Sequence, residues 1–589
     1  IMSDYGLDPT DFKNGSKSPF KYFSKLEKGR IEPLTATFKK LVNLSEWYSN
    51  GSKCKERIIA AADAGLMALV EELVWENDEK ILEYNTAVEV KKRLTMLGIL
   101  LDVEKKVQEY CHENNSVILS ETTQFLSKII EGNDTPFIYE KVGGRIDNYL
   151  LDEFQDTSVM QWQNFRPLIK EGIDNGSDSL IVGDVKQSIY RWRGSDWSLL
   201  NHKIYSDFDN RKIRPDSLEY NWRSSENVIN FNNSFFGHIN ELLAKDPIFH
   251  QNSVNQVYQD YFQKIHEKRI PTKGHVYVKF VEIKGTSAMR NSDEVREEFL
   301  ARVKDLIEGG YSQKDIAGRV RKNDEGQEVS NLLISAGYDI MTEDSLLLST
   351  SKAVQRAIAY IKNLIEPSGG IATFLNAENE PLELKEKSLY NICEEIFASM
   401  KELSSEELPF VNTFLDKVLE YVSKNGSDVV GFMRRWEERS STIYITAPEG
   451  RDAIRIMTIH KSKGLEFKAV IIPFMEGKFD DLKGYIWVSP EVEPYNKLRI
   501  LPLSLSKKLM ETSFKDSYIQ EAIISKIDTC NIYYVAFTRA VEQLVIIANP
   551  KSNSMAEELN SVLKNKLNDG VYEIGEWNNP KRGEGIPED

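Results

Sequence analysis

The stretch Tyr149-Leu-Leu-Asp-Glu-Phe-Gln-Asp-Thr157 carries the strongest information about the fold of this chain. A short apolar run ends there in two adjacent carboxylates, Asp152 and Glu153. A buried parallel strand delivers acidic side chains in this way to the carboxyl edge of a sheet, where open α/β folds place their ligands. The pattern repeats at Leu180-Ile-Val-Gly-Asp184, a helix-sized gap later, and Gln187 follows it. The two runs together predict a βαβ unit.

This arrangement suits the hydrolysis of a nucleoside triphosphate. One carboxylate can hold Mg²⁺, which prefers few carboxylates together with phosphate oxygens. The neighbouring carboxylate can orient and deprotonate the attacking water, and an amide such as Gln187 can sense the γ-phosphate. An isolated Asp-Glu pair is more often a solvated turn, so the interpretation depends on the blocks that follow in the chain.

Four further blocks follow in order, and with the first they span residues 149 to 548. They are Gly183-Asp-Val-Lys-Gln-Ser-Ile-Tyr-Arg-Trp-Arg-Gly194, Leu218-Glu-Tyr-Asn-Trp-Arg-Ser-Ser225, Ile456-Met-Thr-Ile-His-Lys-Ser-Lys-Gly-Leu-Glu-Phe467 and Tyr534-Val-Ala-Phe-Thr-Arg-Ala540. Together with Asp152-Glu-Phe-Gln-Asp-Thr157 they resemble the motifs of superfamily 1 DNA helicases of the UvrD type. The residues in these blocks are most similar to those of the branch that contains RecB and the AddA helicase–nuclease subunit.

The resemblance implies an α/β fold with two RecA-like parallel-sheet motor domains, the first of them incomplete, and with inserted helical subdomains. Apolar residues at helical spacing, with few Pro or Gly, support a helical N-terminal region. The predicted domains are a helical subdomain at 1–135, the remainder of the first RecA-like domain at 136–216, the second RecA-like domain at 217–367 and 447–550, a helical insertion at 368–446 and a C-terminal tail at 551–589.

The resemblance also implies roles for the acidic, amide and arginine side chains of these blocks. Asp152 would hold Mg²⁺ and Glu153 would act as the catalytic base, while Gln155 and Asp156 would brace these groups or couple them to the DNA site. Gln187 would sense the γ-phosphate of ATP. Arginine fingers accelerate phosphoryl transfer by about 10³–10⁵-fold in other enzymes. The remaining implied nucleotide contacts are Arg223 and the arginine finger Arg539 at the γ-phosphate, and Glu466 at the ribose.

Aromatic and basic residues that interleave after the second acidic run predict contact with single-stranded DNA. Tyr190 and Trp192 offer stacking faces that any base can use, at about 1–3 kcal/mol per base, and Arg193 can meet phosphate. The alternative is an aromatic cluster at a domain interface, and it suits Trp197 better. The resemblance adds three residues that would lie near the DNA or relay between the two sites: Thr458, His460 and Lys461. Without the surrounding motif, a histidine there would be interpreted as a core residue.

Composition limits the possible functions. With 589 residues the chain has room for three or four domains, and its 41% apolar and 28% charged residues are typical of a globular protein. The net charge of −16 argues against coating nucleic acid with the whole surface. A local basic cleft remains compatible with that charge, because phosphate contacts act over about a Debye length. Four scattered cysteines, no secretory signal and no apolar run near ~20 residues predict a cytoplasmic protein without a membrane partner.

One motif of the resembled family is missing from the sequence. The Walker A loop, Gly-x-x-x-x-Gly-Lys-Ser/Thr, cradles the β and γ phosphates, but the only Gly-Lys pair in this chain is Gly477-Lys478, which Phe479 follows. The sequence also starts with Ile1-Met2. We therefore expect a chain that begins downstream of this loop and binds ATP weakly or not at all. The Asp and Glu/Asp-x-Lys constellation of the related nucleases is not found either, so nuclease activity is not predicted.

The sequence thus predicts an ATP-dependent 3′→5′ DNA helicase or translocase of DNA repair or recombination, with ATP and Mg²⁺ as cofactors. Its expected partners are single-stranded and duplex DNA and a second helicase–nuclease subunit. The direction of movement comes from the resemblance and not from these residues. The alternative is an ATPase-dead paralogue that binds DNA or acts as a scaffold. Such a paralogue should lose residues throughout the nucleotide site, whereas here only the N-terminal motifs are missing.

Overall fold

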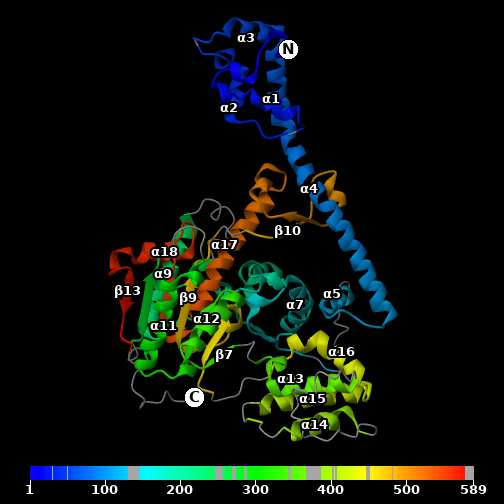
Figure 1. The fold of residues 1–589 in the computed structure, drawn as a ribbon, viewed down its shortest axis with the longest axis vertical. Coiled ribbons are helices and arrows are strands. Elements are labelled where there is room, and N and C mark those ends of the chain that lie inside the picture. Colours follow the sequence, from blue (N-terminus) through cyan, green and yellow to red (C-terminus); the bar gives the residue numbers. More distant parts are fainter. Residues whose placement is uncertain are drawn as a thin grey trace. The chain divides into compact units, whose positions relative to one another are not determined.

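The computed structural model describes residues 1–29, 31–49, 51–130, 144, 146–245, 257–267, 273–283, 288–342, 346–365, 387–400, 403–404, 407–445, 451–479 and 482–577. The chain divides into two compact units (Figure 1). One unit comprises Ile1–Gly132 with Asp480–Ile527, and the other comprises Asn133–Phe479 with Asp528–Asp589.

The first unit begins with short helices around an aromatic cluster. The rings of Phe12 and Phe20 stack with centroids 3.7 Å apart. Trp47 packs edge-on against Phe20 and donates a hydrogen bond to the Leu41 carbonyl. The hydroxyl of Thr35 accepts a bond from a backbone N–H in the first turn of α2 and so caps this helix. The short helices are α1 (Lys21–Leu26), α2 (Ala36–Lys39) and α3 (Lys55–Ala61).

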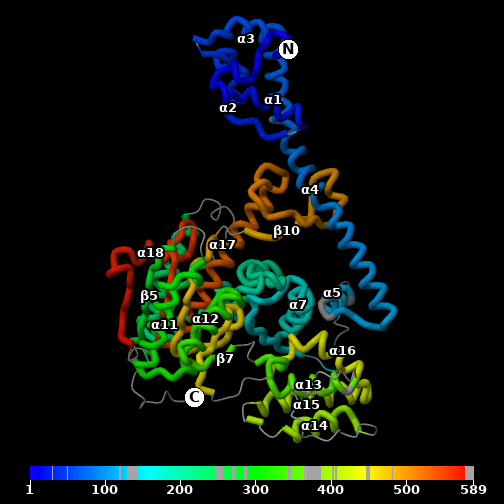
Figure 2. The backbone as a smooth tube through the Cα atoms, viewed as in Figure 1, coloured from blue at the N-terminus to red at the C-terminus, as the bar shows by residue number. Residues whose placement is uncertain are grey.

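A single long helix, α4 (Met67–Glu113), continues from this cluster, and α5 (Leu119–Ile130) follows it (Figure 2). Gly65 has a φ of 105° between α3 and α4, a backbone conformation that suits glycine because it lacks a Cβ. The helical character predicted for the N-terminal region is confirmed over these residues. In the part of the chain that the structure describes, no helix is both long and apolar enough to cross a membrane.

A β-hairpin completes the first unit. Strands β10 (Tyr485–Val488) and β11 (Leu501–Ser504) pair antiparallel, with Tyr485 opposite Ser504. The inner side chains of the hairpin pack against Val90 and Leu97 of α4 in one buried cluster. Helix α17 (Lys515–Phe537) begins after this hairpin. This segment falls within the predicted second motor domain, and no hairpin was predicted there.

The predicted βαβ unit opens the second unit. Strands β1 (Leu150–Leu151) and β2 (Leu180–Ile181) pair in parallel, and α7 (Val159–Asp174) lies between them in the chain. A reciprocal capping box between Ser158 and Gln161 fixes the start of α7. The prediction that these strands are buried is wrong, because Leu150 is 75% and Leu180 55% exposed. Within the described residues the sheet holds only these two strands, and the face that carries Leu150 and Leu180 is exposed.

A seven-stranded sheet forms the centre of the second unit, in the order β13-β5-β12-β9-β6-β8-β7. All neighbours pair in parallel except β13 with β5. This confirms the α/β class and the mostly parallel sheet expected for a RecA-like domain. The strands are β5 (His275–Phe280), β6 (Ile316–Val320), β7 (Ile340–Thr342), β8 (Ile454–Thr458), β9 (Phe467–Met475), β12 (Ala540–Ala548) and β13 (Val571–Ile574).

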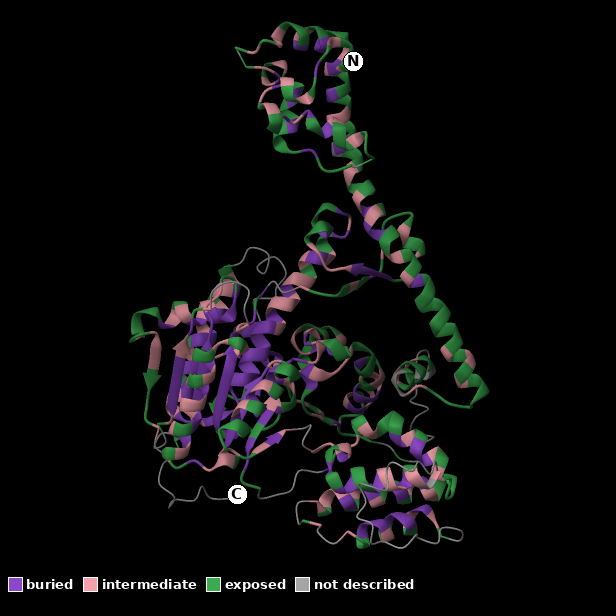
Figure 3. Ribbon diagram, in the orientation of Figure 1, coloured by how far each residue is buried: buried purple, intermediate pink, exposed green. Residues whose placement is uncertain are grey.

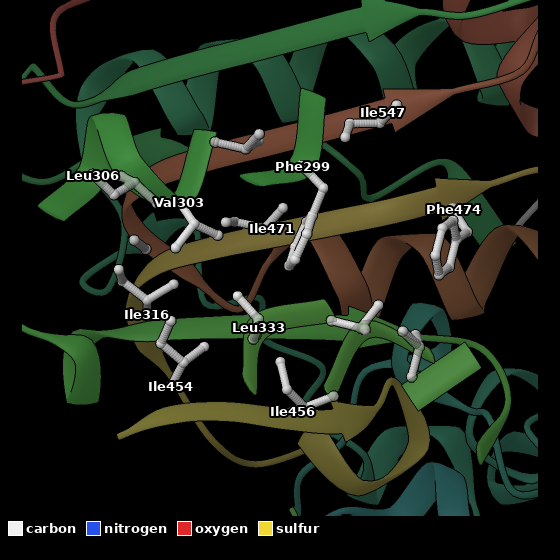
Figure 4. Packing of buried hydrophobic residues seen from close by; sticks show 14 of the residues in the cluster. Phe299, Val303, Leu306, Ile316, Leu333, Ile454, Ile456, Ile471, Phe474 and Ile547 are labelled. Carbon is white, nitrogen blue, oxygen red and sulfur yellow. The ribbon is translucent and has the colours of Figure 1, made fainter. Parts of the chain in front are cut away.

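Helices cover both faces of this sheet, so most residues of its central strands are buried (Figure 3). On one face, Phe299 and Val303 of α11 (Asp293–Glu308) and Leu333 of α12 (Asn323–Ser335) pack on the strands (Figure 4). On the other face, Phe235 and Phe236 of α9 (Glu226–Lys245) contact Phe537 of α17. The end of α17 and the start of β12 therefore lie deep in the core.

Shorter elements flank this sheet. The parallel pair β3 (Tyr220–Asn221) and β4 (Lys264–Ile265) lies at the entry to α9, and α8 (Ile204–Asp207) follows the first predicted DNA-contacting block. The segment predicted as a C-terminal tail is not a plain tail, because α18 (Met555–Leu563) packs on α9 and β13 extends the sheet.

A cluster of four helices has its own apolar core, in which Phe414 packs edge-on against Phe432 and Trp436. The helices are α13 (Lys352–Ile365), α14 (Leu389–Ala398), α15 (Leu408–Asn425) and α16 (Val429–Arg439). A helical insertion was predicted for 368–446. The predicted domain limits at 135/136, 367/368 and 446/447 lie outside the described residues and stay predictions.

Candidate active site

The two adjacent carboxylates lie at the carboxyl end of β1, and the backbone there is unusual. Glu153 has φ 50° and ψ 39°, the left-handed region that side chains other than Gly, Asn and Asp rarely adopt. Its backbone N–H donates to the Asp152 carboxylate at 2.8 Å. This turn leaves both carboxylates exposed at the sheet edge, as a metal-binding and a water-activating group require.

Gln155 is buried and ties the tips of β1 and β2 together. Its Nε2 donates to the Glu153 carboxylate at 2.5 Å, and its Oε1 accepts from the Asp184 backbone N–H at 2.9 Å. A Cβ at Gly183 would stand 2.7 Å from that same oxygen, so only glycine fits there. The predicted bracing position of Gln155 therefore has a direct geometric basis in this contact set.

Gln187 lies between an acid from its own block and an arginine from a distant one. Its Nε2 donates to Asp184 at 3.0 Å, and its Oε1 accepts from Arg539 Nη2 at 3.3 Å. Burial alone would raise the pKa of Asp184, but the ammonium of Lys186 at 2.8 Å and the hydrogen bonds lower it overall. Gln187 and Arg539, which are 352 positions apart, thus contact each other, and their role at a γ-phosphate stays a prediction.

Arg539 is buried at the end of α17 and is only partly satisfied. Burial, with the neighbouring cation Arg223, lowers its pKa to about 10, so its guanidinium is charged at neutral pH. Among the described residues, no hydrogen-bond acceptor meets its Nε atom. Arg223 donates through Nε to Glu466 at 2.8 Å and through Nη1 to the Thr538 carbonyl at 3.3 Å. Four predicted nucleotide contacts, Gln187, Arg223, Glu466 and Arg539, therefore form one cluster.

Trp222 is a site residue that the sequence analysis missed. Its exposed indole stacks on the ring of His266 with centroids 3.5 Å apart. Trp222 immediately precedes Arg223, so this aromatic face lies next to the nucleotide cluster. The signal was present in Tyr220-Asn-Trp-Arg, where a planar side chain stands directly before the predicted phosphate contact.

The predicted DNA-contacting aromatics differ in exposure. Trp192 is exposed, and Arg193 lies over its ring at 4.6 Å. The Tyr190 hydroxyl donates to the His460 carbonyl at 2.8 Å, which joins the first block to the second motor domain. Trp197 is buried, in agreement with the interface interpretation and not with base stacking.

The three residues from the later block also lie around this point. Burial, together with the neighbouring cations Arg321 and Arg193, lowers the pKa of His460, so this imidazole is neutral at neutral pH. Lys461 is exposed on the next position, and its pKa is lowered by partial burial. Thr458 ends β8, opposite Val320 in β6.

Lys463 is a second residue that the sequence analysis missed, and it connects the two sites. Its side chain is 6% exposed. The ammonium lies 2.5 Å from the Asp156 carboxylate, 3.5 Å from that of Glu153 and 5.3 Å from the centre of the Tyr190 ring. Burial raises the pKa of Asp156 although Lys463 opposes this shift. One cation thus contacts the predicted base, its neighbour and a predicted DNA-stacking ring.

A buried arginine next to the nucleotide cluster was also missed. Arg319 of β6 is fully buried, with its guanidinium 4.0 Å above the ring of Phe467. Burial, with Arg539 and Arg455 nearby, lowers the pKa of Arg319 to about 9. Within the described part of the chain, none of its three guanidinium nitrogens has a hydrogen-bond partner. Three arginines therefore raise the positive potential around this cluster.

The residues present fit Mg²⁺ bound together with a nucleotide better than a metal held by protein alone. Among the described residues there is no group of three or more His, Cys, Asp or Glu side chains that could hold an ion. Mg²⁺ takes most of its ligands from phosphate and water when it accompanies a nucleotide, so the single exposed carboxylate of Asp152 is sufficient.

Two families of helicase domains match this chain. Residues 75–209 match the UvrD/REP helicase N-terminal domain, and residues 387–551 match the UvrD-like helicase C-terminal domain. An ATP-dependent helicase/nuclease subunit of Lactococcus lactis subsp. lactis (strain IL1403) is 24% identical over 586 residues, which cover 82% of this chain and 47% of that protein.

Two further relatives have names of the same kind. The RecBCD enzyme subunit RecB of Buchnera aphidicola subsp. Schizaphis graminum is 24% identical over 536 residues, 80% of this chain and 42% of that protein. A probable DNA helicase II homolog of Mycoplasma capricolum subsp. capricolum is 23% identical over 530 residues, 79% of this chain and 64% of that protein. The chain spans less than half the length of its helicase/nuclease and RecB relatives. From these matches and the ordered motifs, the chain belongs to the superfamily 1 helicases of the UvrD/RecB type.

Proposed function

We propose that this chain forms part of the ATP-hydrolysing motor of a DNA helicase that acts in repair or recombination and moves 3′→5′ along single-stranded DNA. The family supports the helicase class, and relatives named as RecB and as an ATP-dependent helicase/nuclease support the repair or recombination setting. By the same analogy, its partners are DNA and a second helicase–nuclease subunit.

The observation that carries this proposal is the contact between Arg539 and Gln187. These side chains come from the two predicted motor domains and meet at 3.3 Å, with Arg223 and Glu466 beside them. Arginines that face a transferred phosphoryl group from the opposite domain neutralise charge that develops in the transition state. The free Nε of Arg539 offers an additional donor to such an anion. A γ-phosphate at this cluster would hold the two domains together.

The residues around Glu153 support the hydrolytic step. Bound Mg²⁺–ATP supplies the phosphoanhydride and neutralises charge on its phosphates. In the proposal, Asp152 holds the metal, and Glu153 accepts a proton from the attacking water through its exposed carboxylate. Gln155 and Lys463 hold the Glu153 carboxylate from its inner side, so one oxygen stays oriented while water reaches the other. General-base catalysis requires this hydrogen-bond reach before any matching of pKa.

Lys463 and Tyr190 would couple ATP hydrolysis to the binding of single-stranded DNA. Bases of single-stranded DNA would stack on Tyr190 and Trp192, with Arg193 at a phosphate. Lys463 contacts the Tyr190 ring and the carboxylates of Asp156 and Glu153. A shift of Tyr190 on binding a base therefore displaces a cation that also touches the predicted base, as a stepping motor requires.

The test is nucleotide binding by the 589-residue chain, measured with a fluorescent ATP analogue and the matching ADP analogue, with and without single-stranded DNA. Because the sequence has no Walker A loop, we expect weak nucleotide binding and retained DNA binding. Most of the predicted nucleotide contacts face the γ-phosphate, so Arg539→Ala should reduce the remaining ATP affinity and leave that for ADP unchanged. Equal effects on ATP and ADP would contradict the γ-phosphate assignment.

The second candidate function is an ATPase-inactive protein that binds DNA or scaffolds a repair complex, although such a protein should have lost residues throughout the nucleotide site. The same titrations separate the two functions. An inactive paralogue binds DNA with an affinity that no nucleotide changes and that Arg539→Ala leaves intact. A motor shows a different DNA affinity with ATP than without it. Tight Mg²⁺-dependent nucleotide binding would instead mean that another segment takes the place of the Walker A loop.

A further inference from the structure

The β10–β11 hairpin of the first unit has one buried face and one exposed aromatic face. Side chains alternate along β10, so Ile486 and Val488 pack inward with Leu501 and Leu503 of β11 against α4. Tyr485 and Trp487 point to the other side and are 48% and 53% exposed. Large exposed aromatic side chains on one small face indicate an interaction surface.

The geometry of this face suits stacking by successive bases. Residues two positions apart in an antiparallel strand lie about 6.8 Å apart on the same side, which places the two rings as separate platforms. Their partners across the hairpin are Ser504, which is half-buried, and Pro502, which is buried, so the two rings are the exposed part of this face. The guanidinium of Arg93 lies 5.0 Å from the Tyr485 ring and supports it from one side. Such platforms accept bases without regard to sequence.

Two adjacent lysines beside the exposed rings favour a polyanion. The whole chain carries −16, whereas the segment 480–527 contains seven Lys or Arg and seven Asp or Glu and is therefore neutral. Lys507 and Lys508 are exposed and directly follow β11, at the end of the hairpin where Tyr485 lies. A phosphate backbone can be contacted by this pair of exposed lysines while bases lie on the neighbouring rings.

We propose that the outer face of the β10–β11 hairpin is a second binding surface for single-stranded DNA, distinct from the one formed by Tyr190 and Trp192. The bases stack on Tyr485 and Trp487, and Lys507 and Lys508 meet the phosphates beside them. This inference rests on the proposed function only to the extent that the chain acts on DNA.

The experiment is fluorescence anisotropy of a labelled oligo(dT) with the 589-residue chain. Because one base–aromatic stack is worth about 1–3 kcal/mol, the double variant Tyr485→Ala with Trp487→Ala should raise the Kd by about tenfold or more. Trp75→Ala is the matched control, since Trp75 lies on α4 in the same unit and is 62% exposed, and its Kd should stay within twofold. An unchanged Kd for the double variant overturns the proposal.

A second measurement does not depend on the aromatic variants folding. Lys507→Gln with Lys508→Gln changes two exposed side chains, and each lost phosphate contact should lower the slope of log Kd against log salt by about 0.7. The conservative variant Trp487→Phe keeps a stacking face and should retain most of the affinity. A salt slope that is the same as in the wild type contradicts the placement of the phosphates.

The variant Tyr190→Ala with Trp192→Ala separates this proposal from the motor itself. If only that variant weakens binding, the hairpin surface is wrong and the proposed motor site stands. If only the hairpin variant weakens binding, the hairpin surface stands and the predicted motor contacts fail. If the hairpin variant changes self-association of the chain and leaves the Kd unchanged, the face binds protein and the proposal is overturned.

Discussion

Lys463→Met tests the ion pair that joins the two motor domains. Methionine keeps the length and the apolar stem of the side chain but removes the ammonium that lies 2.5 Å from Asp156 and 3.5 Å from Glu153. Removing one partner of a buried ion pair costs about 3–5 kcal/mol because a charge is left without compensation. Asp156 is partly exposed, so water recovers some of this free energy, and we expect a loss of about 2–3 kcal/mol.

The change in Tm that this loss of stability causes follows from the entropy of unfolding. Unfolding entropy is about 2.1 cal/mol/K per residue, and the second unit contains about 400 residues. A loss of about 2–3 kcal/mol therefore lowers the Tm of that unit by about 2–4 °C, which differential scanning calorimetry resolves. Lys362→Met is the control, because Lys362 makes an ion pair with Glu437 at 2.8 Å in which both side chains are exposed, and exposed pairs are worth at most about 1 kcal/mol.

The pKa of Asp156 determines how the stability lost in Lys463→Met changes with pH. Burial raises the pKa of Asp156 above its usual 3.8 in the folded chain, so its favourable contribution is full below pH 3.8 and is lost as pH rises through the folded pKa. Without Lys463 that pKa rises further, so the variant should lose most stability at neutral pH and little near pH 4. Asp156→Asn in the Lys463→Met background should restore much of the Tm. The reasoning is refuted if the Tm of Lys463→Met equals that of wild type at pH 7, or if its deficit is the same at pH 4.

Three further variants test individual environments by the same melts. Arg319→Met should raise the Tm by about 1–3 °C, because it removes a buried charge whose nitrogens have no hydrogen-bond partner among the described residues; a lower Tm would show that the guanidinium is satisfied. The pKa of His460 is lowered in the folded chain, so its contribution to stability is present above pH 6.5 and is lost as pH falls through the folded pKa. Between pH 7.5 and 5.5 the Tm of His460→Gln should therefore fall less than that of the wild type. An equal fall in Tm would contradict this. Gly183→Ala places a Cβ 2.7 Å from Gln155 Oε1 and should cost about 1–3 kcal/mol, whereas Gly98→Ala, where a Cβ meets no described atom within 4 Å, should not lower the Tm.

Local patterns were sufficient to predict the elements that carry the site. Apolar runs that end in Asp152 and Asp184 predicted the parallel pair β1–β2. Motif order gave the cluster of Gln187 and Arg539, because each block has a fixed place in the sheet of its family. The strand positions and the identity of each motif can both be recognised from a few neighbouring residues.

Contacts between distant parts of the chain could not be predicted in this way. Lys463 and Asp156 are 307 positions apart, and periodicity gives no information about which loops meet. Arg319 made its segment less apolar than a typical buried strand, although β6 is buried throughout. The exposure of Leu150 was also missed, because an apolar run shows that a side chain can be buried but not that a neighbour covers it.

The uncovered strands β1 and β2 have a consequence for the behaviour of the chain in solution. Unpaired backbone groups beside exposed leucines form a template on which a strand from another molecule can add. Leu150 and Leu180 lie opposite each other in this pair and are both exposed, so a concentrated sample should self-associate through this edge. Replacing Leu150 with Lys would place a charge on the template and should keep the chain dispersed at higher concentration. The strand that delivers the acids to the candidate active site is therefore also a region where chains can associate.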